Sequence, residues 1–445
     1  MCYQRIITLL FLIVSCTVFV HSQVEVVWER SEAMGNKPLW FGTDSERGMG
    51  YGVVGGNERM YVASRGTGVD IRIINALTGD DAGTLDMTEV SGGWFPINDV
   101  DVSADGVIFA CNLALDASSD PFKVYMWHSE DDQPEEIISF NNAPYRLGDK
   151  ITVTGSLDDN TLTIYAAASY ASPDPGDSKN ILRFTTGDHG FTFDVENIEL
   201  GGVDRTGIHP SVGPTAPGQA PFYFNASAGP FDTEQNPTLF EPDGTQVGVL
   251  PGDFTNTNSI RYYELNNRKY IATFRSTGEE DYAVLFDVTD GPEQGDSIAV
   301  TPSLGSVENT FESGDVAFRP DEEDKITLYV LASNNGIGAY SLEFAVPNVQ
   351  NGVTQDYPED YQLYQNYPNP FNPETTIMYS LPRTGMVTLR VYNILGQKLD
   401  TLVNEIRNAG TYTVTFDASN LSSGLYMYRL QADDYTEMKY MLHQK

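Results

Sequence analysis

With 445 residues, 40% of them hydrophobic, the chain is long enough for two or three domains with real cores and is not of disordered composition. Acidic residues number 62 against 26 basic, a formal charge of -36, which argues against a strongly basic face and so against a nucleic-acid partner. Abundant Tyr (25), Phe (22) and Gly (40), without long charged helical stretches, predict an all-β protein.

The N-terminal residues 1–22 are predicted to be a secretory signal peptide. Arg5 is the only charge, an apolar run continues from Ile6 to Val20, and small residues precede a cut near Gln23. A lipoprotein cut before Cys16 is the alternative, and it is disfavoured because the apolar run continues past that residue. No other segment is apolar enough to cross a bilayer. We therefore expect Sec export to the periplasm and a final location outside the cell or at the outer-membrane surface.

Cysteine usage predicts an exported protein without disulfides. Cys2 and Cys16 would leave with the signal peptide, so Cys111 would remain alone in the mature chain. Cys111 lies in the apolar run "VIFACNLA" (107–114), which indicates a buried structural thiol rather than a nucleophile.

Between Trp28 and Phe344 a two-strand pattern recurs six times at the spacing of four-stranded propeller blades. Each repeat has an aromatic-rich strand ending in small residues, a polar turn and a second strand. The first strands are 60–65, 107–114, 162–169, 222–227, 269–276 and 328–333. Their partners are 69–74, 122–127, 180–185, 237–242, 282–288 and 338–344.

Flanking strands complete the expected blades. Inner strands precede the pairs, as in 97–106 and 314–324, and outer strands follow, as in 135–140 and 296–302. The sixth repeat has no outer strand, whereas "VEVVWERS" (24–31) has no repeat of its own. Pairing this strand onto the sixth blade would remove the open edge. The predicted architecture is a six-bladed β-propeller over residues 23–346, closed by the N-terminal strand; seven blades or an open sandwich array are the alternatives.

After a polar, proline-containing linker (347–362), the C-terminal residues 363–445 alternate as strands of a small antiparallel β-sandwich. The rows of apolar residues are Ile377/Tyr379/Leu381, Val387/Leu389/Val391, Tyr412/Val414/Phe416 and Tyr426/Tyr428/Leu430. The lead-in "NYPNPFNPETTIMYSLP" (366–382) is stiffened by prolines, and Tyr367 and Phe371 are expected to pack back onto the sandwich.

This segment resembles the type A C-terminal sorting domain of proteins exported by the bacterial type IX secretion system. The resemblance covers Leu363 to Lys445 and is carried by "QNYPNPFNPETTI", "VYNILGQKL", "AGTYTVTFDASNLSSGLYMYRL" and "KYMLHQK". It implies an immunoglobulin-like sandwich recognised by the secretion machinery at the outer membrane. It also implies that the domain is commonly removed while the cargo is released or attached to surface lipopolysaccharide.

No catalytic or metal motif stands out in the propeller region. The histidines His128, His189, His209 and His443 are scattered, and no HExxH, GxSxG or P-loop occurs. No cofactor is therefore predicted. Calcium binding by "GSLDDN" (155–160) or "PDPGDSKN" (173–180) is the weaker alternative, because neither has the EF-hand spacing. Carboxylates for glycoside hydrolysis are too numerous to be selected from sequence.

The loops that lead into successive inner strands should emerge on one ring face. They carry the candidate ligand-binding residues Trp40, Trp94, Tyr145, Arg146 and His209. Flat aromatic rings beside amides and an arginine would suit a sugar or another polar ligand. The simpler interpretation is that the Trp-Phe pairs cap the corners between blades.

Three functions remain open from sequence, because fold alone does not settle function. The first is a surface module that binds a ligand or extracellular glycan, or acts as a scaffold. The second is a propeller hydrolase or lyase acting on extracellular polysaccharide, and the third is a structural surface-layer protein. Carboxylates with perturbed pKa values on one ring face would favour the enzyme, and an aromatic ledge without them would favour binding.

Overall fold

The computed structural model describes residues 23–169, 179–203, 206–227, 235–278, 280–320, 325–343, 361–366, 368–383, 385–394, 396–407, 410–419, 421–432 and 435–444. The expected signal peptide (1–22), residues 347–360 of the expected linker, and Tyr367 lie outside these ranges. The last two linker residues, Tyr361 and Gln362, are described, and Gln362 pairs with Ser380 as part of a strand. Within them the regular structure is β-strand, apart from one turn of 3-10 helix at Pro292–Gln294. The expectation of an all-β protein is confirmed.

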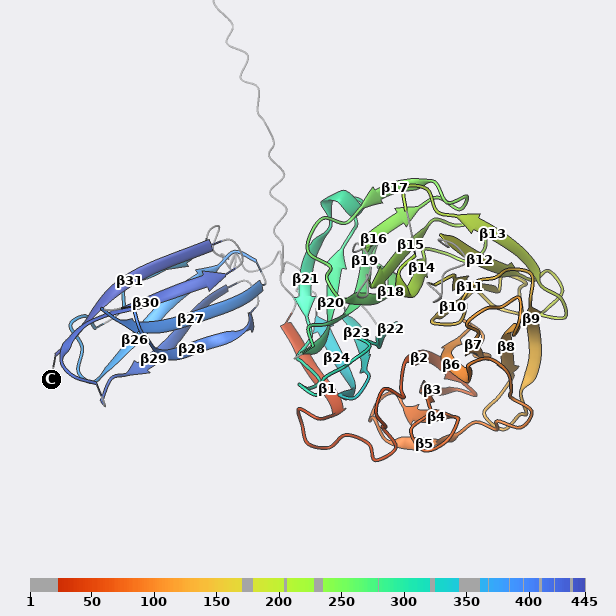
Figure 1. Cartoon of the computed structure of the whole chain (residues 1–445), viewed down its shortest axis with the longest axis horizontal. Helices are drawn as coiled ribbons and strands as arrows, with labels where there is room; N and C mark the ends of the chain where they lie inside the picture. Colours follow the sequence, from red (N-terminus) through yellow and green to blue (C-terminus); the bar gives the residue numbers. More distant parts are fainter. Residues whose placement is uncertain are drawn as a thin grey trace, which may run out of the picture.

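Residues 23–343 form, within the described ranges, six four-stranded antiparallel sheets arranged around a ring (Figure 1). The first sheet contains β2 (Gly48–Val54), β3 (Asn57–Ser64), β4 (Asp70–Asn75) and β5 (Asp81–Thr84). The second contains β6 (Phe95–Val102), β7 (Ile108–Leu113), β8 (Phe122–Trp127) and β9 (Glu135–Phe140). The third contains β10 (Ile151–Thr154), β11 (Thr163–Ala167), β12 (Asn180–Thr185) and β13 (Asp194–Glu199).

The remaining sheets repeat this order. The fourth contains β14 (Ile208–Pro214), β15 (Phe222–Ser227), β16 (Gln235–Phe240) and β17 (Gln246–Val249). The fifth contains β18 (Thr257–Leu265), β19 (Arg268–Ser276), β20 (Asp281–Asp287) and β21 (Asp296–Val300). The sixth contains β22 (Gly314–Pro320), β23 (Lys325–Ala332), β24 (Gly336–Glu343) and, from the other end of the chain, β1 (Gln23–Ser31).

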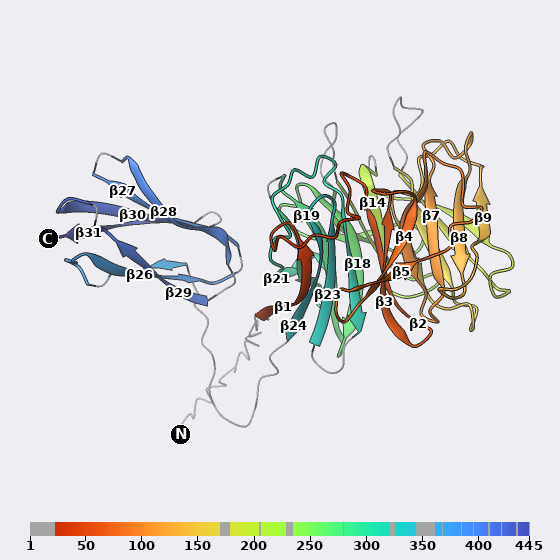
Figure 2. The ribbon, with the colours of Figure 1, turned by 90° about the horizontal axis from the view of Figure 1, so that it is seen from below.

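The strand β1 pairs antiparallel with β24, from Gln23 opposite Glu343 to Ser31 opposite Gly336, with a bulge between Val26 and Trp28. Trp28 anchors it: the ring is 8% exposed, and its Nε1 donates a 2.8 Å hydrogen bond to the carbonyl of Ala76, in the first sheet's region. This strand is therefore the fourth strand of the sixth sheet, where it lies beside β24 (Figure 2), and through Trp28 it also contacts the region of the first sheet.

Neighbouring sheets pack face to face, and each of the six junctions has its own buried apolar cluster, including the junction of the sixth sheet with the first. The inner strands β2, β6, β10, β14, β18 and β22 each contact the next, and β22 contacts β2. Glycine allows the closest of these approaches: a Cβ at Gly48 would lie 2.0 Å from Asp99 Oδ1. The arrangement is propeller-like.

The C-terminal described residues form two packed sheets. One contains β25 (Gln362–Leu363), β26 (Glu374–Leu381) and β29 (Gly410–Asp417). The other contains β27 (Gly385–Asn393), β28 (Lys398–Arg407), β30 (Gly424–Ala432) and β31 (Tyr435–His443). All four predicted apolar rows lie in strands, and residues of each pack in one common core. Strands β28 and β31 were not predicted.

The proline-rich lead-in is attached to the last strand of this sandwich. Phe371 is 2% exposed, its backbone N–H donates to the carbonyl of Leu442, and its carbonyl accepts from Gln444. The Asn366 side chain donates to Thr375 Oγ1 at 2.9 Å and to the carbonyl of Pro368 at 3.1 Å. The expected packing of Phe371 onto the sandwich is confirmed.

Candidate functional site

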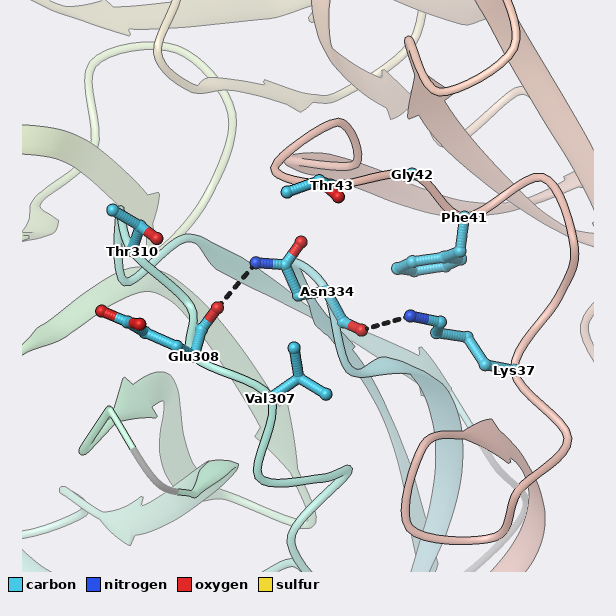
Figure 3. Close-up of a pocket in the computed structure, with 8 residues that line it drawn as sticks. All are labelled: Lys37, Phe41, Gly42, Thr43, Val307, Glu308, Thr310 and Asn334. Carbon is cyan, nitrogen blue, oxygen red and sulfur yellow. Dashed lines mark hydrogen bonds between the residues drawn. The ribbon is translucent and has the colours of Figure 1, made fainter.

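The loops before the inner strands lie together on one face of the ring, which we call the start face; it comprises the described residues of 36–47, 94, 143–150, 206–207, 253–256 and 307–313. A pocket of about 230 Å³ opens where its first and last loops meet (Figure 3). Asn334 stands between them: its carbonyl accepts a 2.7 Å hydrogen bond from Lys37 Nζ, and its Nδ2 donates to the Glu308 carbonyl at 2.8 Å.

Two of the five predicted ligand-binding residues, Trp40 and Tyr145, pack between sheets instead of projecting from the start face. Trp40 is 8% exposed, packs in the core between the sixth and first sheets, and donates a 3.0 Å hydrogen bond to Asp81 of the outer strand β5. Tyr145 is partly buried against the core between the second and third sheets, and its hydroxyl accepts from Asn180 Nδ2 at 2.9 Å. Both rings are held by the scaffold, as the corner-capping interpretation expects for Trp40.

The other three predicted residues lie at the start of inner strands. Trp94, just before β6, is 66% exposed and meets Phe95 edge-on at 6.3 Å between ring centroids. Arg146 forms a two-pronged ion pair with Asp149, at 2.8 Å from Nε and 2.5 Å from Nη2. His209 is buried, and Asp149 influences its pKa electrostatically, so the structure groups Arg146 and His209 around Asp149.

Two arginines that the sequence did not single out belong to the same face. The Arg47 guanidinium lies over the Phe311 ring, 4.6 Å from its centroid, and that of Arg65 lies over Phe95 at 3.7 Å. Arg65 donates to Asn98 Oδ1 at 2.8 Å and to the Asp44 carbonyl at 3.2 Å, both of them neutral acceptors. In the described part of the chain neither arginine has a carboxylate within ion-pair distance.

The pKa values on this face move in opposite directions. Burial raises the pKa of Glu46 to about 7, although hydrogen bonds from Ser64 and the Gly42 N–H lower it in part. Burial also raises the pKa of Glu312, which is only partly buried. Burial alone would raise the pKa of Asp149, but the charge and hydrogen bonds of Arg146 lower it below the ordinary value. Burial lowers the pKa of His209 to about 3, so its imidazole is neutral.

Under the start face, buried charged groups join inner strands across the axis. Lys150 Nζ lies 2.7 Å from Asp315 Oδ2, and Arg261 Nη2 lies 3.3 Å from Asp101 Oδ2. Asp315 also accepts from the N–H of Met49 at 3.0 Å and from Ser259 Oγ at 2.5 Å. Because their lone pairs are used in these bonds, these carboxylates serve the ring rather than an external ligand.

Several non-glycine residues on or beside the start face have a left-handed backbone: Asp44 (φ 53°), His209 (φ 49°), Asn256 (φ 57°), Ser259 (φ 54°), Glu312 (φ 52°) and Asn334 (φ 71°). Such conformations are disfavoured for residues with a Cβ and often occur where a site is preorganised. Asn160, His189, Asn266 and Asn267, in turns at the opposite ends of the strands, have the same conformation, so backbone strain by itself does not select the start face.

Among the described residues, no group of three or more His, Cys, Asp or Glu side chains is placed to hold a metal ion. The acidic loop 155–160 is described, whereas most of 173–180 lies outside the described ranges. No described helix is long and apolar enough to span a membrane. Cys111 is fully buried, and burial raises the pKa of its thiol, in agreement with a structural role.

Sequence reasoning missed Arg47, Arg65, Glu46 and Glu312. A usable signal existed: "DSERG" (44–48) and "FESG" (311–314) place charged residues immediately before the glycine that begins an inner strand, and Arg65 directly follows β3. Residues at these positions necessarily lie near the axis at the start face. The aromatic residues drew the prediction because their side chains suggested sugar binding.

Two family models match the chain. Residues 52–343 match a domain of unknown function (DUF8500), and residues 365–443 match a secretion system C-terminal sorting domain. No curated protein matches the chain.

Several solved structures are similar to the chain. The GH93 α-L-arabinofuranosidase of Fusarium graminearum with arabinobiose has 10% identity and a TM-score of 0.42, covering 72% of this chain and 98% of that one. The α-L-arabinanase of Penicillium chrysogenum with arabinobiose has 11% identity and a TM-score of 0.40, covering 73% and 98%. A GH43_1 enzyme from Xanthomonas citri has 11% identity and a TM-score of 0.34, covering 57% and 86%.

Proposed function

The chain belongs to the DUF8500 family and carries the sorting domain of a type IX secretion substrate, and from this premise we propose that it is exported to the cell surface or beyond to act on an extracellular polysaccharide. The proposed organisation is a signal peptide (1–22) removed after Sec export, a six-bladed propeller (23–346) closed by β1, a linker (347–362) and the sorting domain (363–445). The pairing of β1 with β24 supports the closure.

The proposed activity of the propeller is cleavage of a glycosidic linkage, by hydrolysis or by elimination. It is supported by one observation: Glu312 and Asp149 precede inner strands of the sixth and third sheets, and their environments move their pKa values apart. A carboxyl kept protonated can donate a proton to the leaving oxygen, whereas an ionised carboxylate can stabilise positive charge that develops on the sugar; because both oxygens of Asp149 bind Arg146, it is not proposed to activate water. Opposite pKa shifts of two carboxyl groups on one face support an enzyme over a binding module.

Glu312 is the proposed acid because it is only partly buried, so a substrate can reach it. Ser227 Oγ donates to its carboxylate at 3.2 Å, and Asn258 binds its backbone carbonyl, which fixes the residue. Asp149 is the proposed ionised partner, held in place by Arg146. Trp94, Arg146 and His209 remain proposed ligand contacts.

A second candidate, a glycan-binding or scaffold module, is favoured by the exposed aromatic rings of Trp94 (66%) and Phe311 (46%) on the start face. Exposed rings of this kind stack on sugar faces without any need for catalysis. The two candidates share one surface and differ in whether the bound glycan is cleaved.

The proposal is tested by incubating the secreted full chain with a panel of neutral and acidic extracellular polysaccharides. New reducing ends report cleavage, and ultraviolet absorbance of an unsaturated product separates elimination from hydrolysis. Glu312→Gln is expected to lower the cleavage rate about a hundredfold or more, as loss of a general acid does. Glu136→Gln, at an exposed ion pair with Lys123, is the matched control and should retain the wild-type rate.

If the chain binds a polysaccharide but no member of the panel gives new reducing ends, the binding module is favoured. Cleavage that is unchanged in Glu312→Gln would contradict the proposed acid.

A further inference from the structure

Arg47 is a nearly buried cation that forms no ion pair within the described ranges, although Asp149 and Asp44 act on it electrostatically. Arg47 is only 8% exposed, and its Nε has no hydrogen-bond partner among the described residues. A guanidinium removed from water without an acceptor is unfavourable, and such groups in proteins are normally paired. The position is therefore suited to an anion that arrives from outside.

Other charges surround Arg47. Burial lowers the pKa of Arg47 and Arg146 lowers it further, whereas Asp149 and Asp44 raise it in part. Burial and the charge of Arg47 lower the pKa of Arg65 to about 10, against the opposing effect of Glu46 and Asp149. Asp149 is the nearby ionised acid, but both its oxygens bind Arg146. The net charge of the chain is -36, so an excess of basic residues does not explain why arginines that repel one another lie together on one face.

The two unpaired guanidinium groups are also preorganised. Arg65 already donates from Nη1 to Asn98 and from Nη2 to the Asp44 carbonyl, so only its remaining N–H groups are available. Each guanidinium lies over an aromatic ring, Arg47 on Phe311 and Arg65 on Phe95, which fixes its plane, and the Nε of Arg47 stays without a partner among the described residues. This is the geometry in which arginine recognises a planar carboxylate with two hydrogen bonds. His209 adds a buried Nδ1 with no described partner beside the same charges.

The aromatic neighbours narrow the ligand further. Two exposed aromatic rings lie beside Arg47 and Arg65, namely Phe311 and Trp94, which is next to Phe95. One ligand would therefore meet both a positive charge and a flat apolar surface. A uronic acid presents both a carboxylate and an apolar sugar face.

We propose that Arg47 and Arg65 bind the carboxylate of a uronic acid, so that the polysaccharide recognised at the start face is an acidic one. This inference rests on the proposed function for the polymer class, and it can hold or fail separately from cleavage.

The experiment is calorimetric titration of the full chain with tetragalacturonic acid and with its fully methyl-esterified form, which keeps the rings and removes the charge. Titrations use the Glu312→Gln background to prevent turnover and are repeated with wild type. We expect the ester to bind at least tenfold more weakly than the acid. Arg47→Gln and Arg65→Gln should each weaken acid binding at least tenfold and leave ester binding unchanged.

Arg59→Gln is the control, because Arg59 is ion-paired with Glu130 at 2.9 Å and lies outside the cluster. If Arg47→Gln does not fold, the partly exposed Arg65 decides the outcome alone. Equal affinity for acid and ester, or acid binding that is insensitive to both substitutions, would overturn the inference. So would arginine-dependent binding of a sulfated tetrasaccharide without binding of the acid.

The two proposals fail differently. Binding of the acid without cleavage would remove the enzyme and keep the uronate site. Cleavage of neutral polymers without binding of tetragalacturonic acid would keep the enzyme and remove the uronate site.

Discussion

The ammonium group of Lys150 lies 2.7 Å from the carboxylate of Asp315, 165 residues later in the chain, with 4% and 1% of the two side chains exposed. The pair joins the third sheet to the sixth across the axis. Lys150 also donates to the carbonyl of Arg47, from the loop before the first sheet. One side chain therefore ties together three sheets that are not neighbours along the chain.

Lys150→Met should lower the free energy of unfolding by about 3–5 kcal/mol, because it leaves the buried Asp315 without its cation. Urea unfolding of the ring measures the loss. Lys123→Met, which breaks an exposed pair with Glu136, should cost less than about 1 kcal/mol. Similar losses of unfolding free energy in the two variants would show that the buried Lys150–Asp315 pair contributes no more to stability than the exposed pair.

Trp28→Ala should destabilise the ring by about 3–5 kcal/mol through loss of a buried ring and the hydrogen bond to Ala76. Val26→Ala in the same strand, at a residue 49% exposed, is the control and should change stability by less than about 0.5 kcal/mol. Thermal unfolding of both variants checks whether β1 is an integral strand. A small effect of Trp28→Ala would mean that β1 is dispensable.

Glu46 predicts a pH dependence of stability. Because burial raises its pKa from 4.5 to about 7, the folded state holds its proton more tightly than the unfolded state. Its contribution is complete below about pH 4.5 and is lost as the pH rises through about 7, a change of about 3 kcal/mol. The measurement is the difference in unfolding free energy between wild type and Glu46→Gln across this range. A difference independent of pH would refute the assignment.

In the sorting domain, the Tyr428 hydroxyl accepts from the Asn366 N–H and donates to the Tyr364 carbonyl, both at 2.8 Å. Tyr428→Phe should cost about 1–3 kcal/mol, because it leaves buried backbone groups unpaired. Hydrogen exchange of the β26 and β30 amides in the full chain should accelerate. Tyr440→Phe, at a residue 56% exposed, should leave exchange unchanged.

Strand positions in the ring were predictable because they depend on local alternation and small residues. The expected strands 122–127, 135–140, 180–185 and 222–227 coincide with β8, β9, β12 and β15. The expected pairing of the N-terminal strand with the last repeat is also found, and it could be predicted because the sixth repeat lacked an outer strand of its own. β28 and β31 escaped because their alternation is interrupted by charged residues such as Glu437 and Lys439.

The site was less predictable because it depends on contacts between distant residues. Trp40 looked available, but it is held by Asp81 in the outer strand. Arg47 and Arg65 were not singled out, because nothing local indicates that each lies over an aromatic ring from a different sheet. Arg146 and His209 were chosen for their position before inner strands, which is a property of topology and could be read.

The pairing of β1 with β24 also constrains how the ring can be made. Glu29 and Tyr340 are 311 residues apart, yet Tyr340 donates a hydrogen bond to Glu29. During synthesis and export the first strand must wait until nearly the whole cargo has emerged before it finds its neighbour. Until then the chain exposes two unsatisfied strand edges, so we expect dependence on a holding chaperone in the compartment where the ring is assembled.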